Sequence, residues 1–336
     1  MSDAHVLLRR VVEGGTLDAE QSARLFDVIM RGEIAEGELA AFLTAQALRK
    51  PTIPEITGAA RAMRAAMNKV DPPGPCMDLC GTGGDGKGTL NISTAVTFVV
   101  AACGVPVAKH GNRNMSSKTG AADVLEALGV RIDLPPAAAR RCLEETGVCF
   151  LFAQAYHPAM RHVAAVRRAL GIRTIFNLLG PLSNPAGAKR QLLGVYAHEW
   201  LEPLAHVLKS LGSEKVWVVH GHDGLDEVTT TDITHVAVLE RGNVTPRDIA
   251  PEEAGLQRNT PEALKGGTAE ENAHTIRRLF GGEPGPYRDV VLMNAAAALI
   301  VADKAVDLRD GVALAANAID TGGAQDVLDR LAEATA

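Results

Sequence analysis

The sequence has few cysteines, and none of them is in a paired arrangement. The five cysteines stand mostly in apolar surroundings and never form CxxC: Cys76, Cys80, Cys103, Cys142 and Cys149. An odd, unpaired set argues against a disulfide framework and against a zinc site, and it fits a reducing compartment. We therefore expect a cytoplasmic protein.

Long apolar runs and concentrated basic segments are also missing. No uninterrupted apolar segment reaches the roughly 20 residues that a membrane helix needs. The start of the chain, MSDAHVLLRRVVEGG, lacks the apolar core and cleavage site of a signal peptide. The 34 Lys and Arg residues are dispersed among 40 Asp and Glu residues, and the net charge is −6. This balance predicts no membrane partner and no nucleic-acid partner.

Two hydrolase motifs, HExxH and GxSxG, are absent as well, so a metalloprotease or serine hydrolase has no support.

The first 70 residues have helical periodicity, in LFDVIM, ELAAFLTAQAL and EITGAARAMRAAM, with Pro54 near a helix start. The segment VDPPGP cannot continue a helix. We therefore predict a helical domain at 1–70 and a second domain at 71–336, and we expect the helical stretch 157–186 to return and complete the first.

The second domain alternates short apolar runs with helical stretches. Strands are expected at 77–80, 105–108, 148–153, 191–196, 216–220 and 233–239, followed by a helical C-terminus. This predicts a small all-helical domain followed by a larger α/β domain, whose central sheet is mostly parallel or mixed and flanked by helices. Ligand residues should gather at the carboxyl ends of the strands.

Residues 78–94, DLCGTGGDGKGTLNIST, contain five glycines in eight positions. Glycines let backbone amides approach an anion, and a helix that begins near Asn91 would direct its free N–H groups to the same place. The segment therefore predicts a phosphate site. It also matches GxGxxG, but Lys109 and His110 stand where that motif expects an acid, and it matches GxxxxGK, but Gly88 stands where the P-loop needs a hydroxyl.

A second anion site is predicted by residues 109–120, KHGNRNMSSKTG, which follow the strand-like VPVA. Three cations, two amides and three hydroxyls in twelve residues suit a phosphate. The alternative is a solvated turn before the helix ADVLEALG, which Thr119 would help to cap.

Acidic and basic candidates follow. Asp226 and Glu227 lie in GHDGLDEVTTTD, after the strand VWVVH, and paired carboxylates beside phosphate sites suit Mg²⁺; the alternative is a solvated acidic loop. Asp223 and Asp232 are weaker candidates.

If a helix begins at Pro158, positions 160, 163, 164 and 167 share a face, which would turn Arg167 inward and Arg168 outward. An inward arginine usually meets a carboxylate or phosphate. A surface ion pair for either arginine, and a capping or core role for His157, stay open.

Four segments, in this order and spacing, resemble the anthranilate phosphoribosyltransferase family: DLCGTGGDGKGTLNIST, KHGNRNMSSKTGAADVLEALGV, HPAMRHVAAVRRALGIRTIFNLLGPLSNP and DGLDE. The resemblance runs nearly from end to end. It implies transfer of the phosphoribosyl group of phosphoribosyl pyrophosphate (PRPP) to the amine of anthranilate, in tryptophan biosynthesis. It also implies Mg²⁺ as cofactor, release of pyrophosphate, and a homodimer.

The same resemblance implies the site residues. Lys109, Asn112 and Arg167 would serve catalysis, Ser93, Asp226 and Glu227 would hold Mg²⁺, and Gly81, His110, Asn112, His157 and Arg167 would surround anthranilate. PRPP would be bound by Gly81, Gly83, Gly84, Asp85, Thr89, Asn91, Ile92, Ser93, Thr94, Lys109, His110, Gly111, Asn112, Arg113, Asn114, Met115, Ser116, Ser117 and Ala121.

Departures from the family pattern are few. Asn114 and Met115 replace a pair that is more often small and apolar, and Ala121 replaces a frequent Ser. A pyrimidine nucleoside phosphorylase shares the fold and the phosphate loop, but Asp78, Leu79 and Cys80 stand where its Lys-His-Ser precedes the glycines. A nucleic-acid-binding relative of the fold would need a basic stripe, which the net charge of −6 opposes.

Overall fold

A seven-stranded sheet forms the centre of the larger part of the chain, in the order β3-β2-β1-β4-β5-β6-β7. The strands are β1 Met77–Gly81, β2 Val107–Gly111, β3 Val148–Phe152, β4 Arg190–Gly194, β5 Lys215–Gly221, β6 Thr234–Glu240 and β7 Asn243–Ile249. Strands β1 to β5 run parallel, and β6 and β7 extend the sheet antiparallel. The computed structural model describes residues 3–113 and 119–336 of the chain.

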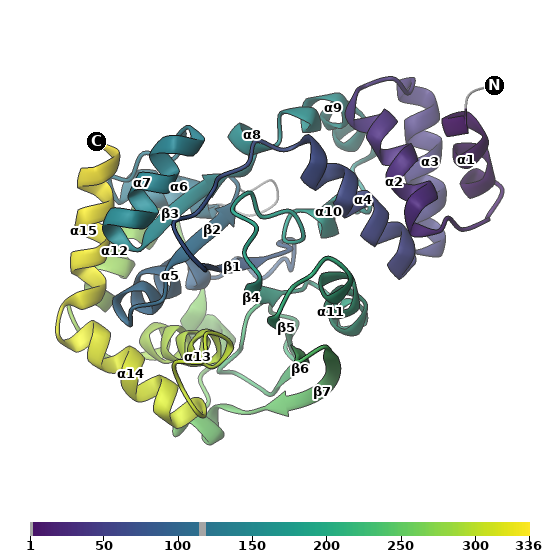
Figure 1. Cartoon of the computed structure of the whole chain (residues 1–336). Coiled ribbons are helices and arrows are strands. Elements are labelled where there is room, and N and C mark those ends of the chain that lie inside the picture. Colours follow the sequence, from purple (N-terminus) through teal and green to yellow (C-terminus); the bar gives the residue numbers. More distant parts are fainter. Residues whose placement is uncertain (1–2, 114–118) are drawn as a thin grey trace.

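Helices cover both faces of this sheet (Figure 1). One face packs on α5 Ile92–Ala102, α13 Pro286–Val301 and α15 Gly323–Thr335, and the other packs on α11 Leu201–Ser210. Neighbouring strand residues divide between the two cores: Leu79 and Leu192 belong to the first, whereas Cys80 and Leu193 belong to the second. This is the period of two that a sheet buried on both sides requires. The remaining helices here are α6 Ala121–Ala127, α7 Pro136–Thr146, α8 Ala153–Tyr156, α12 Ala269–Phe280 and α14 Leu308–Asp320.

The N-terminal helices form a bundle at one end of the molecule (Figure 1). They are α1 Asp3–Val12, α2 Ala19–Met30, α3 Glu36–Arg49 and α4 Ile53–Ala66. Thr52 and Glu55 form a capping box at the start of α4, where Pro54 occupies the first turn. The buried Glu55 carboxylate also accepts a hydrogen bond from the Leu17 N–H at 3.1 Å and pairs with Arg49. One carboxylate therefore joins three segments of the bundle.

Two later helices, α9 Arg161–Leu170 and α10 Phe176–Leu179, pack against this bundle. The Phe176 ring meets the Phe26 ring edge to face, with 5.8 Å between centroids. Val163 and Val166 of α9 share the same hydrophobic core as the bundle. The chain thus brings residues from the middle of the sequence alongside its first helices.

The sheet confirms the expected α/β architecture, with three local corrections. Strand β7 was not expected, because its polar sequence and Pro246 are unusual for a strand; it lies at the edge, where proline is tolerated. Strand β2 continues to Gly111, so Lys109 and His110 belong to the strand and not to the loop after it. The helix expected from Pro158 begins as a short 3-10 turn, and α9 starts at Arg161.

Within the two described segments, 3–113 and 119–336, we find no helix with the length and apolar character that crossing a membrane would require.

Candidate functional site

The glycine-rich loop leaves the carboxyl end of β1, next to the point where the sheet order reverses between β1 and β4. Four of its glycines have a positive φ: Gly83, Gly84, Gly86 and Gly88, at 65°, 78°, 73° and 62°. Glycine adopts this conformation without steric penalty. The far end of the loop is held by a bridge between Thr89 and Lys265 and by the Leu90 N–H, which donates to the Leu264 carbonyl at 2.9 Å.

Helix α5 begins directly after this loop, as the sequence predicts. Asn91 occupies the N-cap position but makes no side-chain cap, because its Oδ1 accepts from Asn272 at 2.8 Å. The first helical residues are Ile92, which is buried, Ser93 and the buried Thr94. The N-terminus of α5 thus directs backbone N–H groups toward the loop, where an anion is stabilised by the helix dipole.

Lys109 brings a positive charge to this helix terminus. Its side chain is only 3% exposed, and its Nζ donates to the Leu79 carbonyl and, at 3.2 Å, to the Ser93 Oγ. Because Lys109 and His110 are successive residues of β2, their side chains point to opposite faces of the sheet. The strand therefore places a cation beside the start of α5 and an imidazole on the other face.

Asp226 and Glu227 follow β5 and reach the same place. The Asp226 Oδ2 accepts from the Gly83 N–H at 2.9 Å, and the Glu227 Oε1 accepts from the Ser93 N–H at 3.2 Å. Loss of water raises the pKa of Asp226, and Asp85 and Glu227 raise it further. Loss of water also raises the pKa of Glu227, to about 7, against the opposing charge of Lys109. Two carboxylates held together in this way favour a cation between them.

These donors suit Mg²⁺ by their chemistry. Magnesium takes hard oxygen ligands, keeps several waters and is usually held by one or two carboxylates together with substrate phosphates. Asp226, Glu227 and the Ser93 hydroxyl provide such a set. Among the residues described, no three His, Cys, Asp or Glu side chains converge as a complete protein cage.

The weaker acidic candidates have structural partners. Asp223 accepts hydrogen bonds from the Leu225 N–H at 3.1 Å and the Thr229 hydroxyl at 2.8 Å. Asp232 forms an ion pair with Arg258 at 3.0 Å. Both side chains shape the loop after β5 instead of joining the pair at Asp226.

His110 and His157 meet on the opposite face of β2. The His110 Nδ1 lies 3.0 Å from the Gly180 carbonyl, so Nδ1 carries the His110 proton and donates it to that carbonyl. The Nε2 atoms of the two rings lie 3.1 Å apart, so the His157 Nε2–H donates to the unprotonated His110 Nε2. Burial, followed by the nearby His157, lowers the pKa of His110 to about 3, and burial lowers the pKa of His157 to about 4. Both rings are therefore neutral at physiological pH.

A buried aspartate below the site was not predicted. Asp78 accepts from the His110 N–H at 3.0 Å and from the Gln191 Nε2 at 3.3 Å, which ties β1 to β2 and β4. Burial raises the pKa of Asp78. The signal in the sequence is a single carboxylate inside an otherwise apolar strand, which needs a specific partner.

Two arginines approach from α9 and the turn after it. Arg167 is half-buried, its guanidinium lies 5.4 Å from the Phe176 ring centroid, and burial lowers its pKa. Arg168 is exposed, as expected, whereas Ala164 is exposed and does not share the inner face. Within the described residues, the Arg167 guanidinium makes no hydrogen bond or ion pair, and the backbone carbonyl of Arg167 accepts from the Gly171 N–H at 3.2 Å. Arg173, which the sequence analysis missed, donates to the Gly84 carbonyl and stacks at 4.1 Å on the Tyr196 ring.

The end of β2 is shaped by packing. A Cβ on Gly111 would lie 2.7 Å from the Phe150 ring, and Ala121 opens α6 nearby. The Asn112 Oδ1 accepts from the Arg113 N–H at 2.8 Å. Arg113 pairs with Asp123 at 2.7 Å and with Glu126 of α6, so its charge is already compensated. The remaining loop candidates, Asn114, Met115, Ser116 and Ser117, lie outside the described residues.

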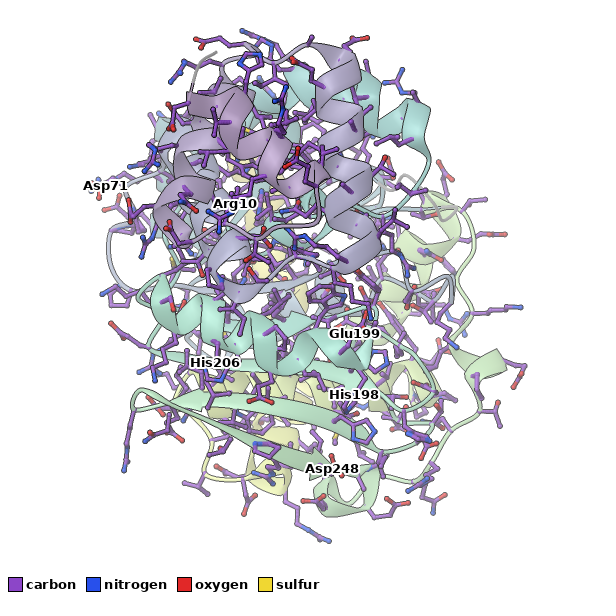
Figure 2. All side chains as sticks on the ribbon, turned by 90° about the vertical axis from the view of Figure 1, so that its right-hand side faces the viewer. Arg10, Asp71, His198, Glu199, His206 and Asp248 are labelled. Carbon is purple, nitrogen blue, oxygen red and sulfur yellow. The ribbon has the colours of Figure 1, made fainter. Side chains whose placement is uncertain are left out.

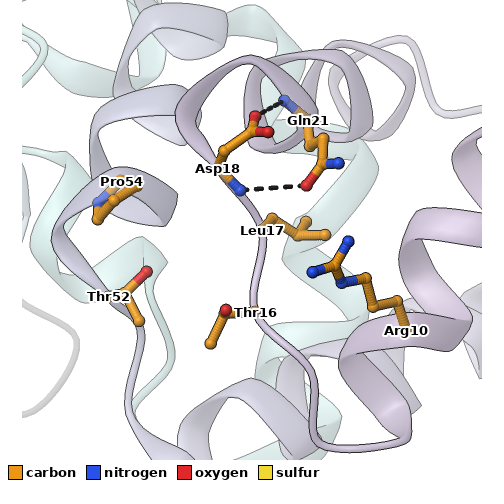
Figure 3. Close-up of a pocket in the computed structure, with 7 residues that line it drawn as sticks. All are labelled: Arg10, Thr16, Leu17, Asp18, Gln21, Thr52 and Pro54. Carbon is orange, nitrogen blue, oxygen red and sulfur yellow. Dashed lines mark hydrogen bonds between the residues drawn. The ribbon is translucent and has the colours of Figure 1, made fainter.

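A separate pocket of about 520 Å³ opens in the helical bundle (Figure 3). Its lining consists of Arg10, Thr16, Leu17, Asp18, Gln21, Thr52 and Pro54. Asp18 and Gln21 bond to each other as the capping box of α2. None of the candidate site residues lines this pocket.

Comparisons with known proteins identify the family of this chain. Residues 73–325 match the α/β domain of the glycosyl transferase family, and residues 6–67 match the helical bundle domain of that family. The chain is 54% identical to an anthranilate phosphoribosyltransferase of Rhodopseudomonas palustris strain BisB5, over 100% of this chain and 99% of the relative. It is 56% identical to that of Azorhizobium caulinodans, over 98% and 96%.

Comparison with solved structures points to the same family. The anthranilate phosphoribosyltransferase of Thermus thermophilus has a TM-score of 0.93 at 45% identity and covers 98% of this chain and 99% of its own. The Saccharomyces cerevisiae enzyme in complex with PRPP and Mg has a TM-score of 0.90 at 26% identity, covering 99% and 97%. The chain belongs to the anthranilate phosphoribosyltransferase family.

Proposed function

We propose that this chain transfers the phosphoribosyl group of PRPP to the amine of anthranilate and releases pyrophosphate, as a step of tryptophan biosynthesis. The observation that carries the proposal is the meeting of Lys109, the Asp226–Glu227 pair and the N-terminus of α5 around the glycine-rich loop. A cation, two carboxylates and the positive end of a helix dipole suit a pyrophosphate bound with Mg²⁺.

In this proposal the protein works mainly by position and charge. Departure of pyrophosphate leaves positive charge on the ribose, so stabilising the leaving group gives the largest gain. Lys109 and the N–H groups of α5 would neutralise the pyrophosphate. Ser93, Asp226 and Glu227 would hold Mg²⁺, which when bound supplies additional charge neutralisation to the phosphate oxygens. The neutral His110 and His157 would surround the acceptor, and Asn112 would orient it.

Arg167 would bind the anthranilate carboxylate. Its guanidinium is half-buried and lies over an aromatic ring, with no ion pair inside the described chain. A desolvated arginine gains most from a planar carboxylate, which it binds through two parallel hydrogen bonds. We propose that the bundle, with 157–186, presents this acceptor side, while the α/β region from residue 71 binds PRPP.

A homodimer and a cytoplasmic location complete the proposal. Val6 of α1 and Leu48 of α3 are 52% and 83% exposed, and we propose that these two apolar side chains contact a second copy. All five cysteines are free thiols, which fits a reducing compartment. Sedimentation of the chain and of a Val6→Glu/Leu48→Glu variant would test the dimer: the variant should sediment as a monomer.

The test of the activity is a product assay with purified protein, anthranilate, PRPP and Mg²⁺. Mass spectrometry should detect N-(5-phosphoribosyl)anthranilate in amounts equal to the pyrophosphate released. Absence of that product, together with nucleoside cleavage by phosphate or with DNA binding, would overturn the proposal in favour of the other proteins with this fold.

A further inference from the structure

Four of the ten histidines gather at the end of the sheet where β5, β6 and β7 pair: His198, His220, His222 and His235. None of them belongs to the site described above. In the sheet register His220 is opposite His235, and His235 is opposite Asp248. Directly paired residues on one face have Cβ atoms about 4.5–5.5 Å apart. The strand pairing therefore brings His220 and His235 together, and we call the four histidines the histidine cluster.

His235 is the centre of the histidine cluster. Its Nε2 lies 3.2 Å from the His222 Nδ1, and its ring centroid lies 4.8 Å from that of His198. His198 and His222 are exposed, and His198 lies on the same side of the molecule as Asp248 (Figure 2). Imidazole nitrogens from separate segments thus face one another at an accessible surface.

Hydrogen bonds fix which nitrogens are free to bind a ligand. The Asp248 carboxylate lies 2.8 Å from the His235 Nδ1, and because a carboxylate only accepts, Nδ1 carries the proton and Nε2 keeps its lone pair. The Val195 carbonyl accepts from the His220 Nδ1 at 2.7 Å, which leaves the His220 Nε2 unprotonated. A histidine whose far N–H is held by a carboxylate or a carbonyl is the usual form of a metal ligand. Burial also lowers the pKa of His220, which favours the neutral ring.

We propose that His222 and His235 form a binding site for a late first-row divalent cation such as Zn²⁺ or Ni²⁺, with Asp248 orienting His235. Nitrogens that lie 2.0–2.1 Å from a tetrahedral ion are roughly 3.3 Å apart, close to the 3.2 Å found here. The ion takes the place of the proton between the two rings, and that proton moves to the Nε2 of His222, so both imidazoles stay neutral and no net proton is released. Imidazole nitrogen suits these metals better than it suits Mg²⁺.

A third ligand requires a change of side-chain rotamer. Among the residues described, no three His, Cys, Asp or Glu side chains already surround one point. The exposed His198 ring is the nearest to His235 and has room to rotate, and His220 stands next to His235 in the sheet. Either ring would complete three-coordination with nitrogen ligands, and water would fill the fourth position.

The experiment is a Zn²⁺ titration of the untagged full chain against a chromophoric zinc chelator, without PRPP and with millimolar Mg²⁺ to occupy the carboxylates at Asp226. The native chain should compete for one Zn²⁺, while His222→Gln and His235→Gln should each lose the competition. Asp248→Asn should weaken binding by roughly 10–100-fold, because it removes the group that orients a ligand.

His206→Gln is the matched control. His206 lies on α11, where it faces Glu202 at 3.5 Å, and Figure 2 shows it farther along the same side of the molecule. This variant should bind as the native chain does. Far-ultraviolet circular dichroism would confirm that each variant folds. No competition by the native chain, or unchanged binding by a folded His235→Gln variant, would overturn the proposal.

Discussion

Gly194 leaves room for the backbone of Asp226: a Cβ on Gly194 would lie 1.6 Å from the Asp226 carbonyl oxygen. The end of β4 therefore acts as the support on which the acidic loop rests. The Asp226 side chain meets a second glycine, since a Cβ on Gly81 would lie 2.7 Å from its Oδ2. Two neighbouring strands thus end in glycine where the carboxylate pair must come close.

Gly194→Ala should displace this loop. Because backbone cannot yield to a Cβ as a flexible side chain can, we expect a loss of at least about 1–3 kcal/mol in the free energy of unfolding and loss of Mg²⁺-dependent activity. Chemical denaturation and the product assay would measure both. Gly37→Ala is the control, since it is exposed in α3 with open space around it; an equally small effect of both changes would refute the supporting role.

Lys109→Met should reduce turnover by roughly 10²–10³-fold, the usual effect of removing one donor that stabilises a developing anion. Methionine keeps the buried volume, so folding should be retained. The Lys109 charge also holds down the pKa of Glu227, and its loss should move the acidic limb of the activity profile to higher pH. A variant with normal activity and an unchanged pH profile would remove Lys109 from the site.

Glu227 should make the protein less stable as the pH rises. Its pKa in the folded chain, about 7, exceeds the ordinary value, so the folded state binds more protons than the unfolded state between about pH 4.5 and 7. The contribution of Glu227 to the stability of the folded state is therefore greatest at pH values below that range, and it is lost as the pH rises through the range. Without Mg²⁺, Glu227→Gln should raise the melting temperature at pH 8 and change it little at pH 5. Equal effects at the two pH values would contradict the shift.

Arg173→Ala should weaken PRPP binding. Its guanidinium joins the Gly84 carbonyl to the Tyr196 ring, so its removal frees the glycine-rich loop from the turn after α9. Loss of a charged hydrogen bond, which contributes about 1.5–3 kcal/mol, should raise the KM for PRPP tenfold or more. The KM for anthranilate should stay nearly constant. Arg168→Ala, at an exposed position of α9, should change neither constant.

Arg167→Ala should instead affect the binding of anthranilate. Loss of a bidentate partner for the substrate carboxylate should raise the KM for anthranilate by roughly tenfold or more, with a much smaller effect on PRPP. Steady-state kinetics with each substrate varied in turn would separate the two arginines. Equal effects on both substrates would exclude the assignment of Arg167 to the acceptor.

Much of the fold follows from local patterns. Six strands and the start of α5 near Asn91 were predicted, because apolar period and glycine content are properties of neighbouring residues. Strand β7 was missed because its side chains are polar and it is defined by pairing with β6. Arg173 was missed for a similar reason: its partner Gly84 lies 89 positions away, and no local pattern reports such a contact.

The placement of Lys109 shows the same limit on a smaller scale. The sequence predicts it as a cation in a loop beside a phosphate site, whereas the structure places it within β2, with its Nζ donating to the Ser93 Oγ. Strand β2 continues because His110 and Gly111 pair with Leu151 and Phe152 of β3. Pairing with a distant strand thus decided which side of the sheet each side chain occupies.

Strand β7 also determines where the sheet ends. Its outer edge carries Pro246, which lacks a hydrogen-bond donor, and the charged Arg247 and Asp248, all exposed. An edge with a missing donor and with charges resists the addition of a strand from another molecule. The same residues that make β7 hard to recognise therefore protect a chain with a large parallel sheet from edge-to-edge aggregation during folding.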